Sequence, residues 1–450
     1  MNKSISITPF TSPCRGEAKV PGSKSITNRA LLLAALSNRK VTLDGALFSD
    51  DVEIMVEALT SLGFAVATDK QTSRITVKGE SGRIPNQASD LFVGNAGTVA
   101  RFLTAALCLR WGGKYRLDGT EAMRERPMQG LIDSLKQLGA RFTFEKKDGH
   151  FPFVIETQGI KQGRWVVDAT ASSQILSAML MVAPLAEETV EVVLKSNTVS
   201  KPFVEMTLKM CDHFSGGNAA FAIKGDNYKT ISNKGYSSSR ENYQIEPDAT
   251  AASYFLALPI ATGGNCSLKG FKKDSIQGDV GFIEVLRETG MLADFTSEGA
   301  YTEARTKSEG KHFDFNDISD TFLTLAALAP LFKGNTTISG IAHTRKQETD
   351  RVSAMANEIR KLGQEVLEDD DSITITPNLE NLRNKALEGV YIDTYHDHRV
   401  AMSFGILGST DVLGNGRPWL TVRDPMCCAK TFPNFFEELE RIRLLSLAPQ

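Results

Sequence analysis

Val20-Pro-Gly-Ser-Lys-Ser-Ile-Thr-Asn-Arg29 runs directly into Ala30-Leu-Leu-Leu-Ala-Ala-Leu36, and this stretch decides how the rest of the chain is interpreted. Pro21-Gly22 marks a turn, the serines and threonine that follow can cap a helix, and the apolar run predicts a helix buried on every side. Lys24 and Arg29 lie at the N-terminal end of that helix, where free N–H groups and the helix dipole already attract anions. Because cations there do not stabilise a helix, the stretch predicts a site for phosphate or carboxylate.

Length and composition are those of a globular protein with more than one hydrophobic core. The chain has 450 residues, of which 41% are hydrophobic and 23% are charged, so we expect two domains of roughly 200 residues each. The formal net charge of -3 excludes a general nucleic-acid binder, because such a protein carries a broad basic surplus. Any anion site must therefore come from local placement of lysine and arginine.

Cysteine spacing and hydropathy indicate the kind of environment in which the protein works. The 6 cysteines show no C-x-x-C spacing and the 6 histidines are scattered, so we expect neither structural disulfides nor a metal site. The N-terminus lacks the apolar region of a signal peptide, and apolar segments such as Ile175–Ala186 are too short to span a bilayer. These features predict a soluble cytoplasmic protein with neither membrane nor nucleic-acid partners.

The combination of a polar helix start and a buried-type helix recurs along the chain. Further copies begin at Asn95, Ser172, Asp248, Asp317 and Asp397. Each buried helix is followed by a short strand, an amphipathic helix that often ends in Leu-Gly or Thr-Gly, and alternating strands. The repeat spans roughly 70–80 residues, longer than common solenoid repeats, and therefore predicts an α/β fold built from six related units.

Six units divide naturally into two domains of three. The boundary is expected in Ser215–Asn242, which is rich in Gly, Ser and Asn and interrupts the apolar pattern between the third and fourth units. We therefore predict an N-terminal domain of residues 22–242 and a C-terminal domain of residues 1–21 plus 243–450. The two segments that cross between the domains are expected to form a hinge.

Cations recur at the helix starts of both halves. Serine, asparagine and aspartate at such positions can be ordinary caps without a function, but lysine and arginine are unfavourable there. If the helices of each domain are parallel, their N-termini converge and predict a cleft lined with cations from both domains, suited to a ligand with several negative charges. The cations in question are Lys24, Arg29, Arg101, Arg126, Arg351 and Arg399.

Other motifs narrow the function class less sharply. No G-x-x-x-x-G-K-[ST] or G-x-G-x-x-G sequence stands between a strand and a helix, which counts against kinases and dehydrogenases. His398 is either an acid that changes its charge near neutral pH or a structural histidine, and the sequence leaves both readings open.

Several segments together resemble the EPSP synthase (5-enolpyruvylshikimate-3-phosphate synthase) family. The resemblance runs from about residue 5 to the C-terminus in the order of the family's motifs. It implies two domains, each of three βαβαββ units arranged as an inside-out α/β barrel. The segments that carry it are Pro21-Gly-Ser-Lys-Ser-Ile-Thr-Asn-Arg29, Gly94-Asn-Ala-Gly-Thr98, Arg124-Glu-Arg-Pro127, Ser172-Ser-Gln174, Glu348-Thr-Asp-Arg351, Asp397-His-Arg399 and Ala429-Lys-Thr-Phe-Pro433.

The resemblance implies transfer of the enolpyruvyl group of phosphoenolpyruvate to the 5-hydroxyl of shikimate 3-phosphate, with release of phosphate. This reaction belongs to the shikimate pathway of chorismate and aromatic amino acid biosynthesis. By similarity, shikimate 3-phosphate is expected to contact Lys24, Ser25, Arg29, Ser172, Ser173, Gln174, Ser200, Asp320 and Gln347. Phosphoenolpyruvate is expected to contact Lys24, Gly97, Arg126, Gln174, Arg351, Arg399 and Lys430.

The chemistry implied by the family needs an acid for the methylene carbon of phosphoenolpyruvate and a base for the 5-hydroxyl proton. The expected carboxylates are Glu348 and Asp320, and Lys24 is expected to stabilise developing charge. Which carboxylate acts in each half-reaction stays open. The reaction proceeds through a tetrahedral adduct and requires no cofactor and no metal.

The sequence departs from the family pattern at a few positions. Gln347 stands where the family usually has a lysine that contacts shikimate 3-phosphate, and an amide supplies no charge. Phe203 replaces a frequent tyrosine, and Phe102 a proline or leucine. These changes bear on substrate affinity more than on reaction type. Gly97, which is not alanine, predicts that the inhibitor glyphosate enters the phosphoenolpyruvate site, although the degree of inhibition stays open.

Two other interpretations compete with this one. The related family that acts on UDP-N-acetylglucosamine shares the architecture but usually places a reactive cysteine near the position of Met123-Arg-Glu-Arg126, where this chain has none. A catalytically silent anion-binding protein is favoured only by Gln347. A phosphate-release assay with both substrates distinguishes these possibilities.

We expect the protein to be a monomer.

Overall fold

The computed structural model describes residues 3–196, 200–231, 235–237 and 241–448. The chain forms two compact units, one of Gly22–Glu246 and the other of Met1–Pro21 with Pro247–Gln450. We refer to them as the 22–246 unit and the 247–450 unit, and we describe each by itself.

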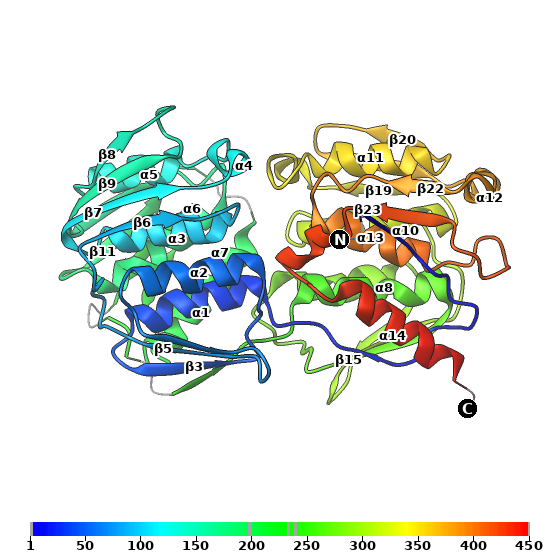
Figure 1. Cartoon of the computed structure of the whole chain (residues 1–450), viewed down its shortest axis with the longest axis horizontal. Coiled ribbons are helices and arrows are strands. Elements are labelled where there is room, and N and C mark those ends of the chain that lie inside the picture. Colours follow the sequence, from blue (N-terminus) through cyan, green and yellow to red (C-terminus); the bar gives the residue numbers. More distant parts are fainter. Residues whose placement is uncertain (1–2, 197–199, 232–234, 238–240, 449–450) are drawn as a thin grey trace. The chain divides into compact units, whose positions relative to one another are not determined.

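Buried helices form the centre of the 22–246 unit. Helices α1 (Lys24–Leu36), α3 (Gly97–Leu107) and α6 (Ser173–Val182) pack against one another inside the strands (Figure 1). Their sequences are apolar around the whole circumference, which suits helices without a solvent face. Amphipathic helices cover them, with apolar residues on the inward side only. These are α2 (Asp50–Ser61), α5 (Gln129–Gln137) and α7 (Lys201–Phe214), joined by the short α4 (Glu121–Arg124) and η1 (Ala183–Leu185).

The strands of this unit form sheets with one repeated pattern. In each, the first two strands are parallel and the following hairpin adds two antiparallel strands, as in a βαβαββ repeat. The orders are β14-β3-β5-β4 (Asn242–Gln244, Lys40–Asp44, Arg74–Lys78, Val66–Asp69), β6-β7-β9-β8 (Ala88–Phe92, Trp111–Asp118, Phe153–Gln158, Arg141–Phe144) and β10-β11-β13-β12 (Gly163–Val167, Val190–Leu194, Asn227–Thr230, Phe221–Lys224).

The 247–450 unit repeats this plan, except that its third sheet has three strands and no hairpin. Helices α8 (Ala249–Thr262), α10 (Phe322–Leu328) and α13 (His398–Gly408) pack together and are buried over nearly their whole length. The remaining helices are α9 (Phe282–Glu288), α11 (Arg351–Lys361), α12 (Leu379–Glu388) and α14 (Phe435–Leu447). Short 3-10 helices precede or extend them, namely η2 (Gly278–Gly281), η3 (Ser319–Thr321), η4 (Ala329–Leu331), η5 (Ala342–Lys346) and η6 (Pro425–Lys430).

The N-terminal segment completes two sheets of the 247–450 unit. Strand β1 (Ser4–Ser6) pairs with β23 and β2 (Glu17–Ala18) pairs with β15, so residues 1–21 belong with the second half of the chain. The orders are β2-β15-β17-β16 (β15 Gly264–Lys269, β17 Gly299–Ala304, β16 Leu292–Phe295), β18-β19-β21-β20 (His312–Asp314, Thr336–Ser339, Ser372–Thr376, Glu365–Glu368) and β1-β23-β22 (β23 Leu420–Arg423, β22 Val390–Ile392).

The stretch Ser215–Asn242, expected from its composition to be a linker, contains strands instead. Its β12 and β13 form a hairpin of the 22–246 unit, and β14 pairs in parallel with β3, so that the unit ends at Glu246 rather than at 242. The apolar pattern lapses because much of the hairpin is exposed, as at Ile223 and Lys224. Residues 232–234 and 238–240 of this stretch lie outside the described residues.

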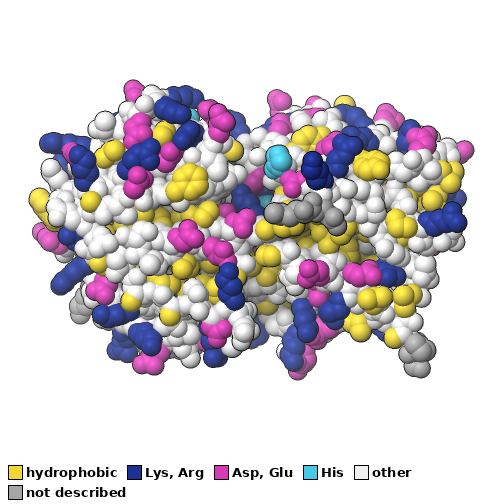
Figure 2. Space-filling view, viewed as in Figure 1, with side chains coloured by type: hydrophobic (Ala, Val, Ile, Leu, Met, Phe, Trp, Pro, Cys, Tyr) yellow, Lys and Arg dark blue, Asp and Glu magenta, His cyan; other side chains and the backbone are white. Residues whose placement is uncertain are grey.

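Surface charge is mixed in sign. On the face shown in Figure 2, lysine and arginine side chains are interspersed with aspartate and glutamate over each unit, in agreement with the formal net charge of -3. Within the described residues, no helix combines the length and hydropathy needed to cross a membrane.

Candidate active site

Helix α1 begins at the residue where the sequence places the first cation. Ser23 is the N-cap, and its Oγ accepts a hydrogen bond from the Ile26 amide at 3.5 Å. Lys24 is the first helical residue, and its Nζ lies 3.4 Å from Oδ2 of Asp51 in α2. Its side chain is 13% exposed, so this ammonium group is held at the rim of the unit by a buried carboxylate that the sequence did not single out.

Arg29 lies one turn further along α1 and is fully buried. Its Nε donates to Thr207 Oγ1 at 2.8 Å and its Nη2 to Ser177 Oγ at 3.3 Å. The Phe102 and Phe203 rings lie against the guanidinium, with centroids at 5.1 and 6.0 Å. Desolvation by burial lowers the pKa of Arg29 to about 10, which still leaves it charged at neutral pH. Both phenylalanines that depart from the family pattern therefore contact this one cation.

The start of α3 gathers two further arginines. Arg101 Nη1 donates to Gln174 Oε1 at 2.8 Å, and Arg126 Nη1 donates to the Asn95 carbonyl at 3.3 Å. A Cβ at Gly97 would lie 2.7 Å from Arg101 Nη1 and 3.0 Å from Arg126 Cζ. Glycine at this position therefore allows both guanidinium groups to lie against the main chain.

The starts of α6 and α7 supply hydroxyl groups. Ser172 caps α6, with its Oγ accepting from the Gln174 amide at 3.3 Å, and Ser173 is the first helical residue. Ser200 precedes α7 in a left-handed conformation with φ of 53°, a strained position for a residue other than glycine. Arg29 and Arg101 connect these helices to α1 and α3, so the N-termini expected to converge do converge within this unit.

The positive charge of this group is only partly neutralised. The hydroxyl and carbonyl oxygens that accept from Arg29 and Arg126 are neutral. Desolvated cations, hydroxyl groups and helix N-termini lie together here, which is an arrangement that favours a bound anion.

Arg351 is the centre of a second group, in the 247–450 unit. It is the first residue of α11 and only 1% exposed. Its Nη1 donates to Asp320 Oδ1 at 2.9 Å, its Nη2 to Glu348 Oε2 at 2.9 Å, and its Nε to Asp397 Oδ2 at 2.7 Å. Its Nη1 also donates to Gln347 Oε1. The structure thus brings Asp320 together with Gln347, Glu348 and Arg351, which lie in one segment of the chain.

The other two expected cations of this half join the same network. Arg399 Nη2 lies 2.7 Å from Asp320 Oδ2, and Lys430 Nζ lies 2.9 Å from Glu348 Oε1. Each carboxylate therefore bridges two cations. The sequence predicted a face lined with cations in both halves, but it did not anticipate that the cations of this half would be paired with carboxylates.

Asp397 and Asp279 are the carboxylates that sequence reasoning missed as members of this group. Asp397 caps α13 by accepting a hydrogen bond from the backbone amide of Arg399. From the sequence, this capping role was a sufficient explanation for an aspartate at that position. Asp279 lies in η2 and bonds Thr250. No sequence signal separates these two from ordinary helix caps, because their partners come from distant segments. His398 is fully buried beside Asp397, which favours a structural role for this histidine.

Asp279 is expected to make stability depend on pH. Desolvation by burial, aided by repulsion from Asp320, raises the pKa of this carboxyl to about 7. Below pH ~4 it is protonated in both the folded and the unfolded chain. As the pH rises from ~4 to ~7, the unfolded chain loses this proton while the folded chain keeps it, so the free energy of unfolding falls. Asp279→Asn should therefore stabilise the protein more at pH 8 than at pH 5. The difference between the two stabilisations should be roughly 3 kcal/mol.

Denaturant unfolding of wild type and Asp279→Asn at both pH values measures this difference. Asparagine keeps a partner for Thr250, so the comparison isolates the charge. An equal effect at the two pH values would contradict the assignment.

Within the described residues, no group of three or more histidine, cysteine, aspartate or glutamate side chains is placed to hold a metal ion. The described cysteines are unpaired thiols.

Comparison with known proteins identifies the family. The family model described as EPSP synthase (3-phosphoshikimate 1-carboxyvinyltransferase) matches residues 10–439. The chain is 48% identical to the 3-phosphoshikimate 1-carboxyvinyltransferase of Opitutus terrae, over 99% of this chain and 98% of the relative. It is 40% identical to the protein of the same name from a Marinomonas species, over 96% and 98% of the two chains.

Solved structures agree on the fold. An EPSP synthase from Acinetobacter baumannii has a TM-score of 0.79 at 23% identity and covers 98% of each chain. An enolpyruvyl transferase from Streptomyces tendae has a TM-score of 0.74 at 15% identity, over 98% of this chain and 97% of its own. Fold, repeat pattern and sequence similarity point the same way, and the chain belongs to the EPSP synthase family.

Proposed function

We propose that this chain is a 3-phosphoshikimate 1-carboxyvinyltransferase of the shikimate pathway. It transfers the enolpyruvyl group of phosphoenolpyruvate to the 5-hydroxyl of shikimate 3-phosphate and releases phosphate. Identity of 48% over nearly the whole length of a relative with this name supports the proposal. The observation that carries it in the structure is the network of Arg351, Arg399 and Lys430 with Asp320 and Glu348.

Shikimate 3-phosphate is proposed to bind mainly through the 22–246 unit. Serine hydroxyls at helix starts and desolvated arginine suit the phosphate and the carboxylate of this substrate. Hydroxyl and guanidinium groups donate hydrogen bonds to an anion and carry no negative charge that would repel it. The residues are Lys24, Ser25, Arg29, Ser172, Ser173, Gln174 and Ser200, with Asp320 and Gln347 contributed by the 247–450 unit.

Phosphoenolpyruvate is proposed to bind the paired cations. The planar forks of Arg351 and Arg399 match a carboxylate, while Lys430 offers a compact charge. Their donors are now directed at Asp320 and Glu348, so the incoming anion exchanges with carboxylates that already occupy these positions. Lys24, Gly97, Arg126 and Gln174 of the 22–246 unit complete the proposed set.

The proton transfers follow from the two carboxylates. Negative charge arriving beside Glu348 favours its protonated form, which can then give its proton to the methylene carbon. The carboxylate of Asp320 takes the proton of the 5-hydroxyl as the hydroxyl oxygen bonds to C2 of phosphoenolpyruvate. In the tetrahedral adduct, Glu348 removes a proton from the new methyl group and the double bond forms. The C–O bond to phosphate breaks as Asp320 returns the proton of the 5-hydroxyl to the departing phosphate oxygen. Lys24 stabilises the charge on the departing phosphate.

The experiment that tests the proposal is a phosphate-release assay with the two substrates, separately and together. The proposal requires phosphate only when both are present, and formation of the enolpyruvyl ether by mass spectrometry. Phosphate release with UDP-N-acetylglucosamine as the acceptor would favour the related transferase. No release with either acceptor would favour a silent anion-binding protein. All proposed residues come from one chain, and the proposal needs neither a second copy nor a compartment other than the cytoplasm.

Gln347→Lys is expected to tighten binding of shikimate 3-phosphate about fivefold. A lysine replaces a neutral hydrogen bond with a charged one, a gain of ~1 kcal/mol that exceeds the loss of the Gln347 bond to Arg351. Titration calorimetry measures the affinity. Gln347→Met is the control, since it keeps the length but has neither charge nor amide, and it should weaken binding. Unchanged or weaker affinity in the lysine variant would contradict this explanation.

A further inference from the structure

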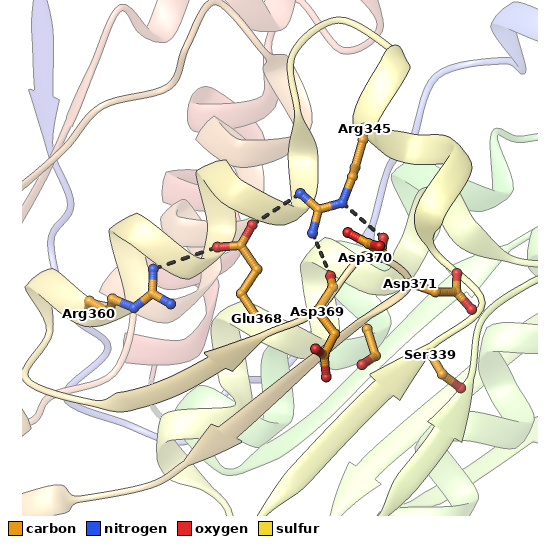
Figure 3. Close-up of a pocket in the computed structure, with 8 residues that line it drawn as sticks. Ser339, Arg345, Arg360, Glu368, Asp369, Asp370 and Asp371 are labelled. Carbon is orange, nitrogen blue, oxygen red and sulfur yellow. Dashed lines mark hydrogen bonds and ion pairs between the residues drawn. The ribbon is translucent and has the colours of Figure 1, made fainter.

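A hollow of ≈ 800 Å³ on the 247–450 unit has an unusually acidic rim (Figure 3). Glu368 ends β20, and Asp369, Asp370 and Asp371 form the turn to β21, with Arg345 and Arg360 opposite. Figure 3 shows that Arg345 points into this turn, where its guanidinium group bonds the carboxylate of Glu368 and the main-chain carbonyls of Asp369 and Asp370.

Arg345 binds two separate segments with one guanidinium group. On the turn, its Nε donates to the Asp370 carbonyl at 2.9 Å and its Nη2 to the Asp369 carbonyl at 2.5 Å. On the other side, its Nη1 donates to both carboxylate oxygens of Asp350, at 3.0 and 2.9 Å. It also lies 3.0 Å from Glu368 Oε1. Asp350 is the N-cap of α11, so the arginine connects the hairpin turn to the start of this helix.

The same turn also holds the other end of η5. Asp371 Oδ1 accepts from the Ala342 amide at 2.7 Å, and its Oδ2 accepts from the Gly340 amide at 3.3 Å. The segment from Gly340 to Asp350 is therefore attached to the turn at its beginning by Asp371 and at its middle by Arg345, which also binds Asp350 at the end of the segment.

The attached segment carries substrate-binding chemistry. Gln347 and Glu348 lie between Arg345 and Asp350, and Arg351 follows directly. Gln347 and Glu348 both accept hydrogen bonds from Arg351. If the pair between Arg345 and Asp350 were lost, the four residues between them would be held only by the site network and by the cap that Asp350 forms on α11.

We propose that Arg345 is a positioning residue for the reaction, which fixes the Gln347–Arg351 segment by connecting the Asp369–Asp371 turn to Asp350. The proposal rests on the proposed function for its kinetic consequence. It assigns no contact with substrate to Arg345. Its effect is to keep Glu348 and Arg351 in the geometry that proton transfer and carboxylate binding require, where a misplacement of about 1 Å can cost a factor of ~100.

Arg345→Gln tests the proposal, with Arg287→Gln as the matched control. Arg287 also binds a carbonyl and two carboxylates in the 247–450 unit, at Ala293, Glu284 and Asp294, but holds no proposed site residue. In Arg345→Gln we expect kcat/KM for phosphoenolpyruvate to fall roughly 10- to 100-fold. The calorimetric affinity for shikimate 3-phosphate should change far less, because most of its proposed contacts lie in the other unit. Arg345→Lys keeps the charge but not the fork, and should recover part of the loss.

Several outcomes decide the matter. A folded Arg345→Gln protein with wild-type kinetics, or with losses no larger than those of Arg287→Gln, would overturn the proposal. If Arg345→Gln fails to fold, Arg345→Lys is judged by the same kinetic comparison. Wild-type protein that releases no phosphate would overturn the proposed function instead. In that case hydrogen exchange at the Gln347–Arg351 amides decides, since the proposal requires faster exchange in Arg345→Gln than in Arg287→Gln.

Discussion

Replacing Arg351 with methionine is expected to lower the free energy of unfolding of the 247–450 unit by about 3–5 kcal/mol. The guanidinium is 1% exposed and separates three carboxylates, of which Asp397 is fully buried. Methionine fills much of the volume but leaves these acids without their shared partner. The cost comes from the uncompensated buried charge, which exceeds the net contribution of the ion pairs themselves.

The position of the tryptophans allows this loss to be measured in one unit. The chain has 3 tryptophans, and Trp419 lies in the 247–450 unit, whereas Trp111 and Trp165 lie in the other. In a Trp111→Phe, Trp165→Phe background, the fluorescence of Trp419 during urea unfolding reports the stability of the unit that holds Arg351. This matters because a chain with two units need not unfold in one step.

Arg305→Met is the control for the Arg351 experiment. Arg305 pairs with Glu303 at 3.1 Å on the surface of the same unit, with its side chain 62% exposed, so its loss should change stability by no more than ~0.5 kcal/mol. If Arg351→Met costs less than ~1 kcal/mol, the three carboxylates find other partners and the account of the network is wrong.

The parts of the fold that the sequence predicted are those in which one segment carries its own signal. The run from Lys24 to Leu36 is apolar on every side, and the structure buries it from Ile26 onward. Four of the six helix starts coincide with an N-cap because the same local pattern recurs, whereas α3 begins at Gly97 and η3 at Ser319, two residues after the predicted Asn95 and Asp317. The hairpin of β12 and β13 was missed because much of it is exposed, and the composition of the surrounding stretch made it look like a linker.

The candidate site shows the same division. The sequence singled out the cations because they stand at or beside helix starts, where positive charge is unfavourable and therefore conspicuous. Their carboxylate partners were not all found, because an aspartate at a helix start already has a sufficient explanation as a cap. Arg351 meets Asp397 across 46 positions in sequence, and no local rule selects that pair. The connection that Arg345 makes between the Asp369–Asp371 turn and Asp350 was missed for the same reason.

Lys24→Ala is expected to reduce turnover on the order of 10²- to 10³-fold while changing stability little. The ammonium group is proposed to stabilise charge on the departing phosphate, and alanine supplies no substitute. For folding, the loss is offset in part, because a cation in the first turn of α1 opposes the helix dipole. Asp51, the partner of Lys24, lies in the first turn of α2, where the dipole of that helix favours its negative charge even without the lysine.

Asp51→Asn separates a catalytic from a structural role for Lys24. This variant breaks the same 3.4 Å ion pair but leaves the ammonium group in place. If Lys24 acts on the substrate, turnover should fall far more in Lys24→Ala than in Asp51→Asn, at similar melting temperatures. If the ion pair mainly supports the fold, both variants should lose stability and activity in parallel. Lys24→Arg should recover only part of the turnover, because a planar fork does not place its charge where a compact ammonium does. Full activity in Lys24→Arg would contradict stabilisation of charge at one phosphate oxygen. It would indicate instead that Lys24 attracts the negatively charged substrates through its charge alone.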